Sequence, residues 1–159
     1  MREQMTPGVR LAKKAGIAFN SHEYKHDPKA ASYGLEAVEK LNIAEDQVFK
    51  TLVVETVDNR LVATIIPVAG TLNLKKGAGA CGSKKIAMAD KNRVQKTTGY
   101  VLGGVSPLGQ KKLLPTFIDS SALTFDTIYV SGGKRGLEIE LAPKDLADLL
   151  GASLIELCD

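Results

Sequence analysis

A lysine inside an apolar stretch is the first candidate for chemistry in this sequence. The run "QVFKTLVVET", residues 47–56, is rich in strand-forming residues and predicts a β-strand. Because strand side chains alternate between two faces, Lys50 shares a face with Val48, Leu52 and Val54. An ammonium group among aliphatic neighbours is costly to desolvate. Lys50 is therefore expected either to hold an anionic or strongly polar partner or to extend to solvent from the strand's end.

Two glycine-rich segments could bind an anion. They are "GGVSPLG", residues 103–109, and "SGGKRG", residues 131–136. Glycine allows backbone N–H groups to come close to an anion or a developing oxyanion. Neither segment has the spacing of a nucleotide phosphate loop, and the second is also typical of a hairpin turn. The residues alone leave tight turns and anion-binding loops as alternatives.

Metal and serine-nucleophile chemistry have little support. His22 and His26 have a spacing that suits metal ligands on a helix, but the residues between them favour a strand, so no metal site is predicted. Neither Ser106 nor Ser131 has a nucleophile elbow around it, and nothing indicates a catalytic triad.

Length and composition indicate one globular domain over residues 1–159. Hydrophobic residues make up 44% of the chain and charged residues 25%, as in ordinary soluble proteins. No apolar run approaches the ~20 residues of a membrane span, and the N-terminal stretch lacks the apolar segment of a secretory signal. A cytoplasmic protein without a membrane partner is expected. For Cys81 and Cys158 a disulfide stays open, and two reduced thiols are the preferred interpretation.

The charges are unevenly distributed along the chain. Residues 71–135 contain eleven basic and three acidic side chains, a net charge of +8, whereas the remainder carries −5. A basic middle segment between acidic flanks favours a surface that faces a polyanion. The same pattern would arise from charges that scatter in space or from a dimer interface.

Helical and strand patterns alternate without a regular repeat, which predicts an α+β fold. The pattern indicates one mixed, curved or barrel-like β-sheet surrounded by helices. Helices are expected over residues 7–15, 32–41, 72–81, 91–98 and 143–150. Strands are expected over residues 17–24, 48–56, 60–66, 84–89, 115–119, 125–131 and 136–141, and at the start of "YVLGGVSPLG" from residue 100.

Several longer motifs resemble one known family. They are "HEYKHD" (22–27), "VFKTLV" (48–53), "PVAGTLNLKK" (67–76), "TGYVLGGVSPLGQKK" (98–112) and "IYVSGGKRGLEIEL" (128–141). Together they resemble the YbaK group of free-standing aminoacyl-tRNA deacylases, which is related to the editing domain of bacterial prolyl-tRNA synthetases. Within that group they are similar to the Cys-tRNA(Pro) deacylases. The resemblance covers nearly the whole chain and implies a barrel-like sheet surrounded by helices.

The resemblance also implies particular site residues. The family lysine falls on Lys50, and the glycine loop supplies Gly103 and Gly104 as backbone donors near the reacting carbonyl. Where relatives carry "GLDIEL" this chain has Glu138, whose carboxylate lies one methylene further out. The expected substrate-binding residues are Tyr24, Ser106, Pro107, Ser131, Gly132 and Glu138. The basic residues expected to hold tRNA phosphates are Lys75, Lys76, Lys111, Lys112, Lys134 and Arg135.

The implied reaction is hydrolysis of the ester that joins cysteine to a mischarged tRNA(Pro), without a metal or other cofactor. In this family the cysteine thiol of the substrate is thought to attack its own ester and release a thiolactone, so no protein nucleophile is required. The family also implies prolyl-tRNA synthetase as a partner, and no DNA partner is expected. The alternatives are a deacylase for another amino acid, such as alanine or serine, and a non-catalytic module that binds tRNA or a synthetase.

Overall fold

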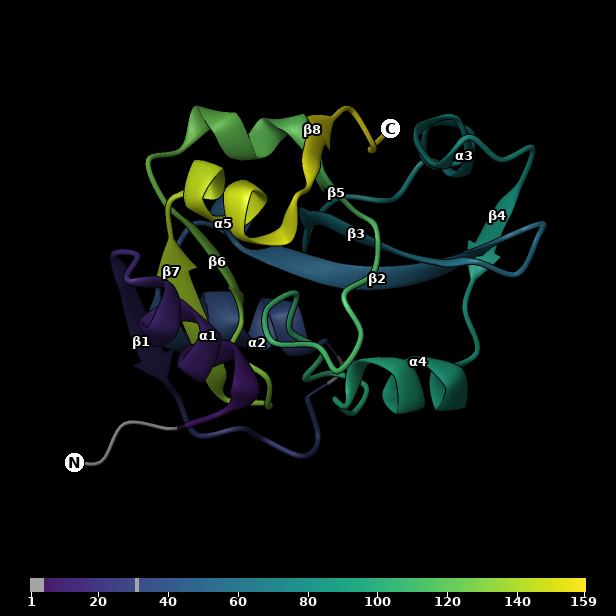
Figure 1. The fold of residues 1–159 in the computed structure, drawn as a ribbon. Helices are drawn as coiled ribbons and strands as arrows, with labels where there is room; N and C mark the ends of the chain where they lie inside the picture. Colours follow the sequence, from purple (N-terminus) through teal and green to yellow (C-terminus); the bar gives the residue numbers. More distant parts are fainter. Residues whose placement is uncertain (1–4, 31) are drawn as a thin grey trace.

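The chain folds around two β-sheets, seen in a computed structural model that describes residues 5–30 and 32–159 (Figure 1). One sheet has three strands in the order β1-β7-β6, and the other has five in the order β4-β2-β3-β5-β8. The strands are β1 (Phe19–Glu23), β2 (Phe49–Thr56), β3 (Leu61–Pro67), β4 (Ile86–Met88), β5 (Thr116–Asp119), β6 (Ile128–Ser131), β7 (Leu137–Leu141) and β8 (Ser153–Ile155). The α-helices are α1 (Pro7–Ala15), α2 (Tyr33–Leu41), α3 (Leu74–Cys81), α4 (Lys91–Thr98) and α5 (Pro143–Leu150).

The predicted α+β class is confirmed, but the sheet is not closed as a barrel. The three-stranded sheet is antiparallel, and the five-stranded sheet joins an antiparallel β4-β2-β3 part to the parallel strands β5 and β8. A parallel bridge between Val48 and Tyr129 links the two sheets just before β2 begins. Beyond that bridge β2 and β6 separate.

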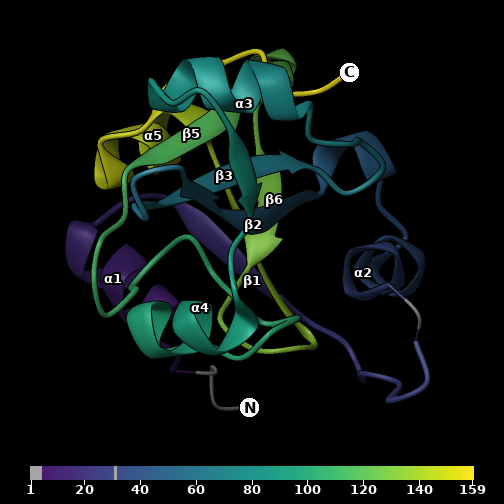
Figure 2. The same cartoon turned by 90° about the vertical axis from the view of Figure 1, so that its right-hand side faces the viewer.

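The two faces of β2 pack against different parts of the molecule. Val53 lies in an apolar cluster with Val94 of α4, whereas Val54 lies in a cluster with Ala78 of α3. This alternation follows from the two-residue period of a strand. Helices α3 and α4 consequently lie on opposite faces of the five-stranded sheet, as both views of the ribbon show (Figure 2).

Local residues account for three helix starts and for one turn. The side chains of Thr6, Ser32 and Asp90 each accept a hydrogen bond from the backbone N–H three residues further on, as N-caps of α1, α2 and α4 do. The hairpin between β2 and β3 turns at Asn59, whose φ of 64° lies in the left-handed region.

Three features differ from the sequence-based expectation. The strand expected from residue 100 is absent, because residues 99–115 form a long loop in which Gly103 and Gly109 have positive φ angles. The strand β8 was not predicted, because its three residues follow α5 too closely to show a pattern. Two short 3₁₀-helices, Glu45–Gln47 and Ser120–Thr124, were also not predicted as such.

Candidate active site

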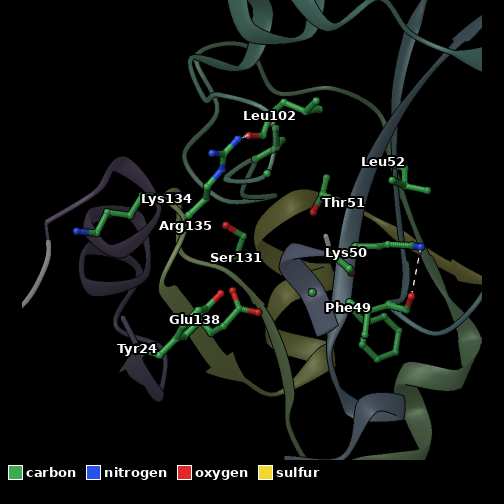
Figure 3. Close-up of a pocket in the computed structure, with 15 residues that line it drawn as sticks. Tyr24, Phe49, Lys50, Thr51, Leu52, Leu102, Ser131, Lys134, Arg135 and Glu138 are labelled. Carbon is green, nitrogen blue, oxygen red and sulfur yellow. Dashed lines mark hydrogen bonds between the residues drawn. The ribbon is translucent and has the colours of Figure 1, made fainter. Parts of the chain in front are cut away.

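A pocket of about 300 Å³ lies where the two sheets separate. Because β4 pairs with β2 only at Val54–Thr56, the earlier part of β2 has an edge that no described strand covers. The pocket lies along this edge and is closed by the β6–β7 turn, the start of α2 and the loop after α4 (Figure 3). Its lining residues are Tyr24, Ser32, Gly34, Phe49, Lys50, Thr51, Leu52, Val68, Leu102, Gly103, Val105, Ser131, Lys134, Arg135 and Glu138.

Lys50 lines the pocket, and its ammonium has a polar partner. The Nζ atom donates a hydrogen bond to the Val68 backbone carbonyl at 3.3 Å. In Figure 3 the side chain extends toward that carbonyl and away from Ser131 and Glu138. A bond of this length is weak, and a lysine side chain has a flexible four-carbon stem. The Val68 carbonyl therefore holds the ammonium only loosely.

Glu138 places a carboxyl group in the wall opposite β2. Glu138 on β7 lies directly opposite Ser131 on β6, so the two side chains share one face of the three-stranded sheet. Glu138 is only 7% exposed, and burial raises its pKa to about 8. Tyr24 lines the same wall, and its pKa rises to about 12 through burial first and then through the negative charges of Glu138 and Glu36. A carboxyl group in this setting gains most from a cationic partner.

The burial of Glu138 predicts a pH-dependent cost to stability. From the ordinary pKa of 4.5 up to about 8, the folded state keeps a proton that the unfolded state has lost, so stability falls as pH rises through this window. Glu138→Gln removes that titration. We expect the variant to be no more stable than wild type near pH 4 and more stable at pH 8.5, by roughly 5 kcal/mol at most. Urea unfolding at both pH values measures the difference in free energy of unfolding between the variant and wild type. If that difference were the same at pH 4 and pH 8.5, Glu138 would not be a buried carboxyl group that titrates in this range.

Of the two predicted glycine donors, only Gly103 lines the pocket. Gly103 has a φ of 86°, which a residue with a Cβ rarely adopts. The N–H of Gly104 donates to the Val101 carbonyl at 2.9 Å, so it is already used within the turn. A Cβ at Gly104 would also lie 2.9 Å from the Lys134 Cα. Gly104 therefore allows the loop to pack closely against the β6–β7 turn.

The residues predicted around Ser106 lie outside the pocket lining. Ser106 is fully buried, and its Oγ accepts a hydrogen bond from the Leu108 N–H at 3.1 Å. Pro107 is also buried in this turn, which packs near Gly8 of α1. Gly132 is likewise absent from the lining, and its N–H donates to the Leu137 carbonyl at 2.8 Å in the hairpin. These contacts give all three residues a role in shaping the loops, and their contact with substrate stays a prediction.

Sequence reasoning missed Thr51. It lies beside Lys50 on β2 and lines the pocket, and its Oγ1 is buried without a hydrogen-bond partner among the described residues. A buried hydroxyl without a partner is unfavourable, so a bound substrate is a natural partner for it. Its place next to Lys50 was the available signal, because four successive residues of β2, Phe49 to Leu52, line the pocket along the strand edge. Gly34 was missed as well, although a glycine inside an expected helix indicates close packing. A Cβ there would lie 2.3 Å from Val68 Cγ1.

Both histidines have carboxylate partners. His22 Nε2 lies 2.9 Å from Glu140 Oε1, and His26 Nδ1 lies 2.7 Å from Glu36 Oε1. Burial opposes ionisation of Glu36, but hydrogen bonds from His26 and the Asp27 N–H outweigh it and lower the Glu36 pKa. This contact attaches the segment before α2 to the helix that closes the pocket. Within the described ranges no group of three His, Cys, Asp or Glu residues is arranged to hold a metal ion.

Comparison with known proteins identifies the family. Residues 27–149 match the family described as aminoacyl-tRNA editing domain. A protein of Enterococcus faecalis described as a candidate Cys-tRNA(Pro)/Cys-tRNA(Cys) deacylase, EbsC, is 36% identical over 157 residues, which cover 98% of this chain and 94% of that protein. A proline–tRNA ligase of Brachyspira hyodysenteriae is 27% identical over 99 residues, 62% of this chain and 17% of the ligase.

Solved structures agree on the fold. The crystal structure of a candidate trans-editing enzyme for prolyl-tRNA synthetase superimposes with a TM-score of 0.84 over 98% of this chain and 99% of that one, at 22% identity. The chain therefore belongs to the aminoacyl-tRNA editing domain family, whose members act on the ester of aminoacyl-tRNA. In the described ranges no helix is long and apolar enough to cross a membrane, and Cys81 and Cys158 are free thiols.

Proposed function

We propose that this protein removes cysteine from mischarged Cys-tRNA(Pro) in trans, acting in the cytoplasm on tRNA that prolyl-tRNA synthetase has charged wrongly. The family match supports an aminoacyl ester as substrate, and the 36% identical relative supports cysteine as the amino acid. The likeness to a proline–tRNA ligase supports the link to proline charging and makes prolyl-tRNA synthetase a natural partner.

The observation that carries this proposal is the pairing of a small pocket with a buried carboxyl group. A volume of about 300 Å³ has room for an aminoacyl group and part of the terminal ribose. Every aminoacyl ester carries an α-ammonium group next to its reacting carbonyl. Glu138 offers the complementary charge, because a nearby cation favours the ionised carboxylate that burial opposes. Glu138 would therefore fix the α-ammonium while Lys50 approaches the ester from β2.

The chemistry relies on the substrate's thiol. The lining residues include hydroxyl groups of Ser131 and Thr51 but no histidine or cysteine that could form an activated nucleophile pair. The cysteine sulfur attacks its own ester carbonyl, the bond from the carbonyl carbon to the ribose oxygen breaks, and that oxygen takes up the proton lost by the thiol. A thiolactone leaves and water opens it to free cysteine.

The protein contributes position and electrostatic stabilisation to this step. An ester is already activated, so fixing the reacting groups supplies much of the catalysis. Negative charge develops on the carbonyl oxygen, and the Lys50 ammonium and the backbone of Gly103 are the pocket groups suited to stabilise it.

Deacylation of a panel of charged tRNAs tests the proposal. We expect purified protein to release cysteine from Cys-tRNA(Pro) at least tenfold faster than alanine from Ala-tRNA(Pro) or proline from Pro-tRNA(Pro). Spontaneous hydrolysis of each ester, measured without protein, is the baseline. A preference for alanine would assign the pocket to that amino acid instead, and no release above baseline from any tRNA would reject a deacylase.

A further inference from the structure

The basic residues of the middle segment are divided between two faces of the molecule. Lys75 and Lys76 are on α3, whereas Lys111 and Lys112 lie in the loop of residues 99–115 that follows α4. Because α3 and α4 lie on opposite faces of the five-stranded sheet (Figures 1 and 2), the two pairs of lysines cannot contact the same short stretch of RNA. The charge around each pair decides which face suits a polyanion.

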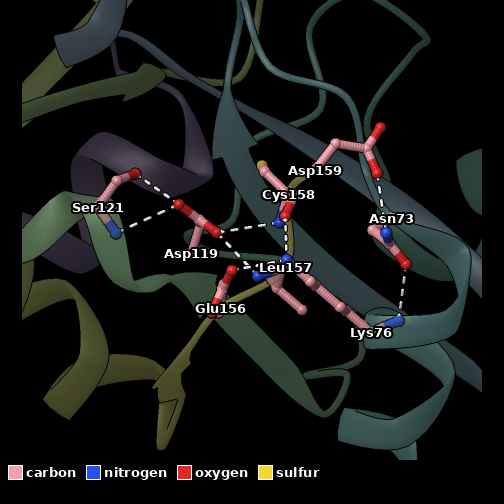
Figure 4. Close-up of polar contacts among 8 residues, drawn as sticks. All are labelled: Asn73, Lys76, Asp119, Ser121, Glu156, Leu157, Cys158 and Asp159. Carbon is pink, nitrogen blue, oxygen red and sulfur yellow. Dashed lines mark hydrogen bonds and ion pairs between the residues drawn. The ribbon is translucent and has the colours of Figure 1, made fainter.

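The α3 face is neutralised by acidic residues. The Lys76 Nζ lies 2.6 Å from Glu156 Oε1 and also donates to the Cys158 carbonyl at 2.8 Å (Figure 4). Asp159 accepts a hydrogen bond from the Asn73 side chain at 2.8 Å on the same face. The adjoining hollow is lined by Asp46, Asp119, Glu156 and Asp159. Phosphate groups would be repelled here by the carboxylates.

The α4 face has the opposite character. Between Asp90 and Asp119 the sequence contains no acidic residue, and Lys96, Lys111 and Lys112 are all exposed. The N–H groups of Lys111 and Lys112 donate to carbonyls in the last turn of α4, at 2.9 and 3.2 Å. These bonds hold the two lysines beside Lys96, which lies in that same last turn. Three exposed lysines are thus anchored by their main chains at the end of α4.

This basic group is continuous with the mouth of the pocket. Arg135 donates from its Nη2 to the Leu102 carbonyl at 2.9 Å, and both residues line the pocket. Lys134 lies against Gly104 of the loop that begins at the end of α4. The loop therefore connects the pocket to the lysines at the end of α4. We call the surface of Lys96, Lys111, Lys112, Lys134 and Arg135 the α4 track.

We infer that the α4 track binds the phosphate backbone of the tRNA acceptor stem, and that the α3 lysines do not. The inference rests on the proposed function, which places the 3′ end of the tRNA in the pocket. With the ester at Lys50 and Glu138, the chain of nucleotides leaves past Arg135, and the duplex behind it lies over the end of α4. Lysine and arginine contacts to phosphates position a nucleic acid without reading its sequence, which suits a surface outside the pocket.

Charge reversal at matched lysine pairs tests this inference. The double variant Lys111→Glu/Lys112→Glu alters the α4 track, and Lys84→Glu/Lys85→Glu changes the charge equally at an exposed pair between α3 and β4. We expect the first to weaken binding of uncharged tRNA(Pro) at least tenfold at 100 mM salt and the second to change it less than twofold. The salt dependence of log Kd should become shallower by about one unit per lysine in the first variant only.

The substrate's size separates this inference from the proposed function. The cysteinyl ester of adenosine can place its aminoacyl group in the pocket, but it has no acceptor stem to contact the α4 track. The Lys111→Glu/Lys112→Glu variant should therefore cleave it at the wild-type rate. Equal weakening of tRNA binding by the two pairs would overturn the α4 track, as would wild-type binding by the first variant. Because uncharged tRNA is bound without reaction, the binding result stands even if wild type fails to deacylate either substrate, an outcome that would reject the proposed function instead.

Discussion

Replacing Lys50 with alanine is expected to lower the single-turnover rate on Cys-tRNA(Pro) by roughly 10²–10³-fold, the usual effect of deleting one group that stabilises a developing oxyanion. Lys50 is the cation that lines the pocket from β2, and its bond to the Val68 carbonyl is weak enough to exchange for the substrate. The fold should persist, because Lys50 is only partly buried and its ammonium makes one long hydrogen bond, to a backbone carbonyl. Thermal melting beside the kinetic measurement separates the two effects.

Two further variants sharpen the assignment of Lys50. Lys50→Arg keeps the charge but replaces the compact ammonium with a larger, planar guanidinium group. We expect this variant to lose most of its activity in so small a pocket. Lys75→Ala removes an exposed lysine from α3 and should leave the rate unchanged. A Lys50→Ala protein with near-normal activity would show that this lysine acts only on the fold.

Glu138 should control how deacylation depends on pH. If the ionised carboxylate holds the substrate's α-ammonium, kcat/KM of wild type should rise with pH up to the carboxyl pKa of about 8 in the free enzyme. Glu138→Gln cannot ionise and should lose roughly tenfold to a hundredfold in kcat/KM at pH 8.5, the range for a hydrogen bond to a charged group. At pH 6, where the wild-type carboxyl is protonated, the two enzymes should differ much less.

The ratio of wild-type to variant kcat/KM is the informative quantity for Glu138. The thiol of the substrate titrates in the same range, but it affects the two enzymes equally and cancels in the ratio. The α-ammonium does not cancel, because only its charged form pairs with the carboxylate of wild type, so the ratio should rise as Glu138 ionises and fall again where the ammonium loses its proton. Glu138→Asp shortens the side chain by one methylene but keeps a carboxyl group, so it should retain the rise with pH. A ratio that stays constant from pH 6 to 8.5 would remove Glu138 from substrate binding.

Local signals in the sequence predicted most of the elements around the pocket. The alternation of β2 and the turn between β6 and β7 depend on nearby residues alone, and both are confirmed. The motif resemblance added the residues that the fold brings together from distant segments. Tyr24, Lys50 and Glu138 all line one pocket although they are far apart in the chain.

The errors concern features that tertiary packing decides. Apolar residues from Tyr100 favoured a strand, but the glycines after them and close packing against Lys134 make the segment a loop. Net charge along the sequence could not show that Lys76 is paired with Glu156, because the two residues meet only in the fold. The sequence likewise carries no pattern for the Val48–Tyr129 bridge. This bridge decides where the two sheets are linked.

A single-turnover comparison of three esters of the same tRNA(Pro) tests directly whether the substrate's own thiol is the nucleophile. Cysteine, serine and 2-aminobutyrate differ only in whether the side chain ends in a thiol, a hydroxyl or a methyl group. Attack by the substrate's own thiol predicts rapid release of cysteine, with serine and 2-aminobutyrate slower by roughly a hundredfold or more, because a hydroxyl is a far weaker nucleophile than a thiol at neutral pH and a methyl group is none. Comparable release of 2-aminobutyrate and cysteine would exclude attack by the substrate's thiol, since it would require a water molecule activated by the protein.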